Sequence, residues 1–98
     1  MRSLVITTLL WDDWNTTHIA RHNVTPTEVE AVCSGKHIVR KSYDNRFLVV
    51  GYTPQQRPLL VVLDPEPQEG VFYPVTARTA DRKERQWYEE AKEGGEAA

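Results

Sequence analysis

The spacing of apolar residues changes at Gly35, and this change limits the fold more than any other feature of the chain. Before it, Val29, Val32 and Cys33 recur at the three- and four-residue intervals of one helix face. After it, apolar runs of strand length follow one another between turn residues, over residues 37–43, 46–53, 59–63 and 71–77. The sequence therefore predicts helices first and then adjacent strands, which is an α+β layer fold.

Capping residues and one apolar stripe predict three helices. Thr25 and Glu28 have the spacing of a capping box, with proline between them at the first helical position, so we expect a helix to begin there. Asp12 is placed to cap an earlier helix over about residues 13–22. A last helix is predicted over about residues 79–92, where apolar side chains form one stripe.

Residues in the strand region also predict a hairpin turn and one irregular strand. Asp44 and Asn45 lie between two strand-like runs and suit a tight hairpin turn. Pro74 lies inside the last run and cannot donate to a ladder, so it predicts an edge position or a bulge. A short extended entry is expected over residues 4–10. Together these signals predict an antiparallel β-sheet meander packed against two N-terminal helices and one C-terminal helix.

Chain length and charge predict one domain over residues 1–92, followed by an acidic disordered tail over residues 93–98. The last ten of the 98 residues hold four glutamates against one lysine, so the net charge of −2 comes from this end of the chain. No apolar run is long enough to span a membrane, and no signal peptide is recognisable. A lone cysteine suits a reducing compartment. We therefore expect a cytoplasmic protein without membrane contact.

Basic residues gather in two segments despite the negative net charge. The segment from Lys36 to Arg57 holds five lysine or arginine residues against one aspartate. The segment from Arg78 to Arg85 holds four against two acidic residues. Such segments suit a local anion-binding face, and ordinary solvated strand and helix surfaces are the alternative interpretation.

Several stretches in the chain match a known pattern in the right order. They are Trp11-Asp12 with residues 18–24 (HIARHNV), residues 46–52 (RFLVVGY), residues 57–62 (RPLLVV), and Thr76-Ala77-Arg78 with Glu84-Arg85 and Tyr88. As a set, these stretches cover roughly residues 10–90 and resemble the BrnT-like toxin family.

This resemblance implies a RelE-like α+β fold and the toxin role in a type II toxin–antitoxin pair. Such toxins cleave RNA without a metal or other cofactor, and a cognate BrnA-like antitoxin binds and neutralises them. The resulting complex, expected as a heterotetramer that contains a toxin dimer, represses its own promoter. The antitoxin supplies most of the DNA contacts. The implied partners are therefore an RNA substrate, the antitoxin and, through the antitoxin, promoter DNA.

Metal-free RNA cleavage needs a base for the 2′-hydroxyl proton, an acid for the leaving oxygen and cations beside the phosphate. By the resemblance and by their chemistry, the candidate catalytic residues are Arg78, His22, Arg46 and Glu84. The candidate RNA-binding residues are Arg21, Arg40, Lys41, Arg85 and Tyr88. Three tyrosines are further candidates for stacking on single-stranded bases, although packing against the sheet is the favoured role: Tyr43, Tyr52 and Tyr73.

The main candidates also have structural interpretations. Arg78 can form a surface ion pair with Asp81 or Glu84. Arg46 can be a charged residue that protects an edge strand from pairing with another chain. His22, at the end of a helix, can be a favourable partner of the helix dipole.

Metal and thiol chemistry are not expected. His18 and His22 are four residues apart on a helix, a spacing that suits a metal, but no further Cys/His pair or Glu-x-x-His motif completes a site. Cys33 lies on the buried face of its helix, where thiols are usually inert. We expect no metal and no other cofactor.

Two other functions stay open beside the endoribonuclease toxin. The first is a catalytically inactive BrnT-like module that acts only in complex with a protein partner. The missing family lysine after Trp11-Asp12 and the acidic C-terminal residues favour it. The second is a stand-alone nucleic-acid-binding domain, whose binding should weaken steeply as salt rises.

Overall fold

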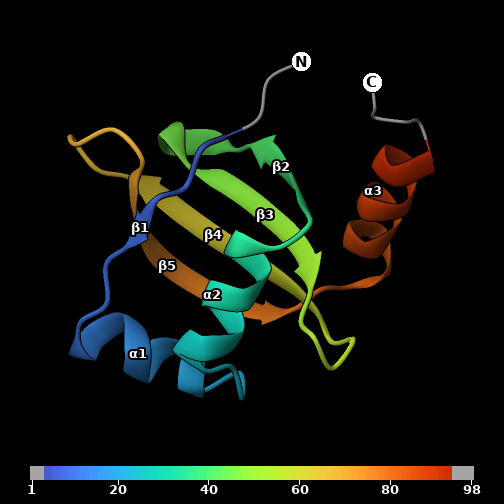
Figure 1. Cartoon of the computed structure of the whole chain (residues 1–98). Coiled ribbons are helices and arrows are strands. Elements are labelled where there is room, and N and C mark those ends of the chain that lie inside the picture. Colours follow the sequence, from blue (N-terminus) through green and yellow to red (C-terminus); the bar gives the residue numbers. More distant parts are fainter. Residues whose placement is uncertain (1–3, 94–98) are drawn as a thin grey trace.

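The computed structural model describes residues 4–93 and is built around one five-stranded sheet (Figure 1). Two helices follow the first strand and pack on one face of the sheet, and the last helix packs on the other face. The elements in chain order are β1 (Thr8–Leu9), α1 (Asp13–Ala20), α2 (Pro26–Ser34), β2 (His37–Lys41), the short 3-10 turn η1 (Tyr43–Asn45), β3 (Phe47–Tyr52), β4 (Pro58–Pro65), β5 (Val71–Thr79) and α3 (Arg82–Glu93). The predicted α+β class is confirmed.

The sheet is mixed, so the prediction of a purely antiparallel sheet is wrong for one strand. Its order is β1-β5-β4-β3-β2, and β2 to β5 form the predicted antiparallel meander. The first strand, β1, pairs parallel to β5, with Thr8 opposite Val71. Backbone N–H groups of Thr7 and Thr8 both donate to the carbonyl of Gly70, at 2.8 and 3.1 Å. The meander leaves this edge of β5 free, and β1 enters it in the same direction as β5.

The predicted irregularity at Pro74 is a bulge. Val62 pairs with Thr76 and Leu63 pairs with Pro74, so Val75 is left without a partner in β4. Because proline has no N–H to donate, a bulge at this point avoids a missing hydrogen bond in the ladder. The carbonyl of Pro74 accepts a hydrogen bond from the Asn15 side chain at 3.0 Å, which ties the bulge to α1.

The predicted turns and helix starts are confirmed in their local detail. Asp44 and Asn45 both have positive φ, 60° and 63°, as the tight turn between β2 and β3 requires. In α2, the Thr25 hydroxyl accepts from the Glu28 backbone N–H at 3.2 Å, and the Glu28 carboxylate accepts from the Thr25 N–H at 3.0 Å. In α1, Asp12 is the N-cap as predicted.

The ends of α1 and α3 differ from the predicted ones. Helix α1 ends at Ala20, two residues early, because Asn23 has a φ of 60° and turns the chain toward α2. Helix α3 begins at Arg82, not near residue 79, because β5 continues as far as Thr79. Residues 94–98 of the predicted acidic tail lie outside the described residues, and Glu93 is the last residue of α3.

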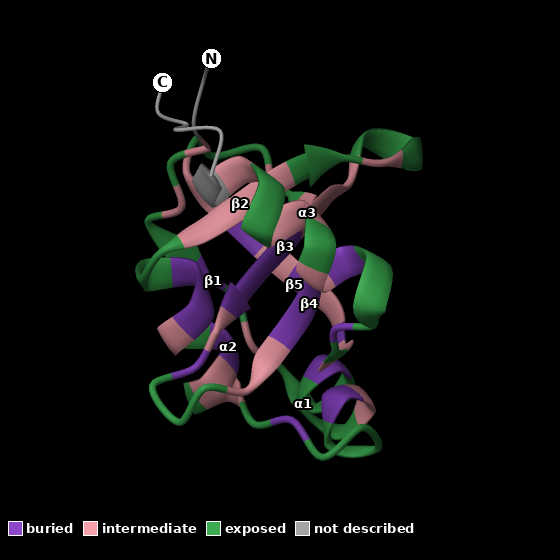
Figure 2. Cartoon of the chain, turned by 90° about the vertical axis from the view of Figure 1, so that its right-hand side faces the viewer, coloured by how far each residue is buried: buried purple, intermediate pink, exposed green. Residues whose placement is uncertain are grey.

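The core is divided by the sheet into two apolar layers. The buried residues of the central strands β3 and β4 are purple in Figure 2. The larger layer joins α1 and α2 to the sheet through Ile19, Val29 and Val32, which are completely buried. The smaller layer lies under α3 and is built around Val50 and Leu60. Neighbouring residues of β3 and β4 alternate between these layers, so both faces of the central strands are covered. None of the described helices is long and apolar enough to cross a membrane.

One arginine fastens the turn between α1 and α2 to the sheet. The Arg57 guanidinium donates to the carbonyls of His22 and Asn23 at 3.2 and 2.6 Å, to the Glu28 carboxylate at 3.1 Å and to the Thr79 hydroxyl at 3.2 Å. Its charge therefore serves the fold, whereas the sequence pattern places it only in a basic segment.

Candidate functional site

Two strand arginines, and a third that directly precedes a strand, lie on the sheet face that α3 covers. Arg78 is directly opposite Leu60, and Arg40 is directly opposite Leu48, and both leucines belong to the layer under α3. Arg46 precedes Leu48 by two residues and so shares its face. We call this surface the α3 face, defined by Arg40, Arg46 and Arg78. It gathers positive charge from β2, from β5 and from the residue before β3.

Arg78 is held in place by Glu84. Its two terminal nitrogens donate to the two carboxylate oxygens of Glu84 at 2.9 and 2.7 Å. Glu84 is only 7% exposed and also accepts from the backbone N–H of Asp81 at 2.8 Å, which caps the start of α3. The hydrogen bond that Arg78 donates to Glu84 raises the pKa of the Arg78 guanidinium, so Arg78 stays charged. The structural interpretation of Arg78 as an ion-pair partner of Glu84 is therefore confirmed.

Arg78 nevertheless keeps a solvent-facing side. Its side chain is 40% exposed, whereas that of Glu84 is 9% exposed. The pair thus presents a positively charged arginine outward and a buried carboxylate inward. A phosphate oxygen that reaches this point would meet a guanidinium whose geometry is already fixed.

Arg46 forms a looser pair. Its Nε donates to the Asp64 carboxylate at 3.1 Å, and the two side chains are 40% and 37% exposed. The interpretation of Arg46 as the guard of an edge strand is wrong, because β3 lies between β2 and β4 inside the sheet. An exposed pair of this kind is worth about 0–1 kcal/mol, so a phosphate can compete with Asp64 for Arg46.

The helix residues of the candidate site lie along α3. Tyr88 packs edge-on against Tyr52 of β3, with ring centres 5.2 Å apart. Arg85 is half-buried and donates to the carbonyl of Ala80 at 3.2 Å, close to the start of the helix. Arg40 lies 4.3 Å from the centre of the Trp87 ring, a cation–π contact. Arg40, Arg85 and Tyr88 therefore accompany Arg78 and Glu84 on one side of the molecule.

The remaining candidates lie elsewhere. Arg21 and His22 are exposed in the turn after α1, and α1 packs on the opposite face of the sheet. The His22 ring lies edge-on to His18, with ring centres 6.0 Å apart. Lys41 follows Arg40 in β2, so it points to the other face, where its ammonium lies 5.6 Å from the centre of the Phe47 ring. The structure therefore does not bring His22 to Arg78.

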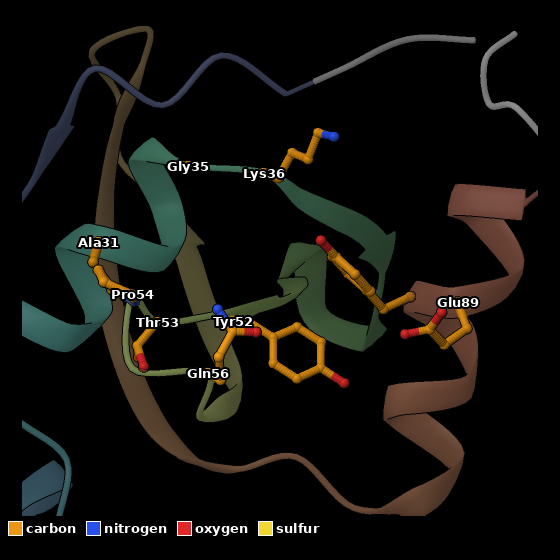
Figure 3. Close-up of a pocket in the computed structure, with 9 residues that line it drawn as sticks. Ala31, Gly35, Lys36, Tyr52, Thr53, Pro54, Gln56 and Glu89 are labelled. Atoms are coloured by element: carbon orange, nitrogen blue, oxygen red, sulfur yellow. The ribbon is translucent and has the colours of Figure 1, made fainter.

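A hollow of about 550 Å³ opens beside Tyr88, between the end of α2, the turn after β3, and α3 (Figure 3). Tyr52 projects from β3 into this space, and Lys36 lies at the opposite end of it. Thr53 is 1% exposed, and its hydroxyl accepts from the Arg57 backbone N–H at 3.1 Å. The lining is mixed polar and aromatic, and it continues the α3 face toward α2.

The side chains of residues 4–93 form neither a cluster of three or more metal ligands nor an activated cysteine. No group of three or more His, Cys, Asp or Glu side chains is close enough there to hold a metal ion. His18 stacks flat on Trp14, with ring centres 4.8 Å apart. Burial raises the pKa of the Cys33 thiol to about 12, with a smaller contribution from Glu30, so the reactive thiolate is scarce at neutral pH.

Two structurally important residues were missed at the sequence level. Asn15 is completely buried and donates to the carbonyls of Leu10 and Pro74 at 2.9 and 3.0 Å, while its oxygen accepts from the Asp12 N–H. Its position three residues after Asp12 is a capping-box signal that could have identified it. Trp87, an apolar residue of α3, carries the Arg40 guanidinium over its ring, and nothing in the sequence predicts this contact.

A comparison with protein-family models finds none that matches this chain, and a comparison with curated proteins finds no relative. What the chain does is therefore inferred from its sequence motifs and from the geometry of the α3 face.

Proposed function

We propose that this chain is the toxin component of a type II toxin–antitoxin system, a metal-independent endoribonuclease with a RelE-like fold that acts in the cytoplasm. The observation that supports this proposal most is the α3 face, where Arg40, Arg46 and Arg78 lie on the same side of the sheet as one helix. Three guanidinium groups on one surface suit a chain of phosphates better than a single small ligand.

The chemistry assigned to this face is attack of a ribose 2′-oxygen on the adjacent phosphorus. The 2′-hydroxyl loses its proton, the bond from phosphorus to the 5′-oxygen breaks, and that oxygen gains a proton, which leaves a 2′,3′-cyclic phosphate and a 5′-hydroxyl. Arg78 is the best-placed cation for the negative charge that develops on the phosphate, because Glu84 fixes its orientation and 40% of its side chain faces solvent. Arg46 and Arg40 would hold the neighbouring phosphates.

The antitoxin is proposed to cover the same face. Leu48 and Val62 lie next to each other in the sheet, are half-buried and pack against the layer under α3. A partner with acidic and apolar side chains could therefore cover these residues and neutralise the arginines around them. The toxin would be inactive in that complex, and promoter DNA would be bound mainly through the antitoxin.

One observation favours the second candidate, a catalytically inactive module that only binds a protein partner. Glu84 is the candidate acid–base group on the α3 face, yet it is buried and already accepts hydrogen bonds from Arg78 and from the Asp81 N–H. Its oxygens are therefore already occupied by partners within the fold, and the carboxylate faces inward, away from a substrate. His22, the other acid–base candidate, lies in the turn after α1, where its ring contacts His18 and not Arg78 or Glu84.

Inducible expression in bacteria tests the proposal. The intact chain should arrest growth, and the double variant Arg40→Gln, Arg46→Gln should relieve the arrest, because both arginines are largely at the surface and their loss leaves the fold intact. Arg82→Gln is the matched control, since Arg82 is an exposed arginine of α3 outside the α3 face, and it should still arrest growth. Unimpaired growth with the intact chain, together with recovery of a tightly bound small protein, would select the inactive module instead.

A further inference from the structure

A second hollow, of about 430 Å³, lies at the end of β2 between the β2–β3 turn and α3. Its lining combines Arg40, Lys41, Ser42, Tyr43, Leu48 and Trp87. The volume falls within the range of about 300–1,000 Å³ that small-ligand sites occupy. On the side of the sheet that faces α3, the hollow thus combines the Arg40 guanidinium with the Trp87 ring, next to the exposed Tyr43.

The cations of this hollow differ from the other arginines described above. Arg46, Arg57 and Arg78 each form an ion pair with a carboxylate. Over the part of the chain that the structure describes, neither Arg40 nor Lys41 has such a partner, and both contact the faces of aromatic rings instead. Their charge is therefore available to an anion from solution without the loss of an existing ion pair.

The aromatic side chains provide flat surfaces that solvent can reach. Tyr43 is 88% exposed, the most exposed of the large apolar side chains in the described part of the chain. Its backbone is part of a tight turn, in which its carbonyl accepts from the Arg46 N–H at 3.1 Å. Trp87 is half-buried and carries the Arg40 guanidinium over its ring at 4.3 Å. An exposed ring on a tight turn is a typical stacking surface for a partner.

We propose that this hollow binds one nucleotide of single-stranded RNA, with the base stacked on Tyr43 and the phosphate bound by Arg40. A base must leave its helix to stack in this way, so single strands are favoured over duplexes. The inference rests on the proposed function, because it assigns part of the substrate to the edge of the α3 face. It adds a positioning site apart from Arg78, at which RNA is held and not cut.

Binding is tested with a fluorescent eight-nucleotide single-stranded RNA that carries 2′-O-methyl groups, so that it cannot be cleaved. Fluorescence anisotropy should show that Tyr43→Ala weakens binding by roughly 5- to 100-fold, the effect of removing a stacking partner of one base. Arg40→Gln should weaken binding and reduce the salt dependence by about 0.7 in the logarithmic slope, as expected for one lost phosphate contact. A duplex of the same sequence should compete poorly.

Two control variants make the result specific. Trp14→Ala removes another exposed aromatic ring, on α1, and Arg82→Gln removes another exposed arginine, on α3; neither residue lines the hollow. Both should change the affinity by less than about twofold, since each lies outside the site. Equal effects of the test and control variants would overturn the nucleotide site and leave the nuclease proposal standing. Binding that depends on Tyr43 without any RNA cleavage would support the site and overturn the nuclease proposal, and no RNA binding at all would overturn both.

Discussion

The Arg78–Glu84 pair allows the structural and functional roles of one arginine to be separated. Arg78→Met removes two charge-assisted hydrogen bonds, at 2.9 and 2.7 Å, and leaves the Glu84 carboxylate without its cation in a site that is 9% exposed. Two such bonds are worth about 3–6 kcal/mol when buried. Because the arginine side is 40% exposed and solvent screens it, we expect a loss of about 2–3 kcal/mol in the free energy of unfolding.

The double variant Arg78→Met, Glu84→Gln should recover most of this loss. It leaves no buried charge, and the side-chain oxygen of the introduced glutamine can still accept from the Asp81 N–H that caps α3. Urea unfolding followed by tryptophan fluorescence gives the free energies for the two single variants and the double variant. The coupling between the two positions should be about 1.5–2 kcal/mol. In thermal unfolding, the single Arg78 variant should lose roughly 10–20 °C, given about 4–8 °C per kcal/mol for a domain of this size.

RNA cleavage by the same proteins decides the role of Arg78. If Arg78 stabilises the phosphate, the double variant is stable and still inactive. A double variant that regains both stability and cleavage would refute this reasoning, because Arg78 would then serve the fold alone. An Arg78→Met variant as stable as the native chain would refute the energetic part, since the buried carboxylate would not need its partner.

Three further predictions concern the rest of the fold. Arg57→Met should lower the free energy of unfolding by about 2–4 kcal/mol, because it removes the donor to the carbonyls of the α1–α2 turn and the cation beside the Glu28 carboxylate. Gln55→Ala, an exposed change in the neighbouring turn, should have almost no effect in the same urea titration. Asn15→Asp places a carboxylate against two buried carbonyls, so the variant should be far less stable at pH 7 and should recover as the pH falls toward 4 and the new group is protonated. Cys33, with a pKa of about 12 in the fold, should react with a thiol reagent at pH 8 only after unfolding; since its unfolded pKa is about 8.5, stability should fall as the pH rises above that value.

The features that the sequence predicts correctly are those that a few neighbouring residues determine. The Thr25–Glu28 capping box, the Asp44–Asn45 turn and the bulge at Pro74 all follow from local backbone chemistry. The parallel pairing of β1 with β5 joins residues about 60 positions apart, and two strand residues carry too little pattern to specify it. The late start of α3 has the same origin, since the pairing of Thr79 with Leu59 extends β5.

The candidate site shows the same difference between features that neighbouring residues determine and features that depend on distant parts of the chain. Once the strand register is known, alternation alone places Arg40, Arg46 and Arg78 on one face. No sequence pattern states on which side of the sheet a preceding helix packs, so His22 could not be placed relative to Arg78. The cation–π contact of Arg40 with Trp87 was equally hidden, because it joins a strand and a helix that are distant in the chain.

RNA cleavage by the purified chain in excess EDTA tests the central claim most directly. The substrate is a single-stranded oligonucleotide, compared with the same oligonucleotide made of deoxyribonucleotides. If the α3 face cleaves RNA through the 2′-oxygen without a metal, the RNA should be cut to products that end in 2′,3′-cyclic phosphate, while the deoxy strand stays intact. An RNA strand that stays whole, or cleavage that disappears with EDTA, would contradict the account.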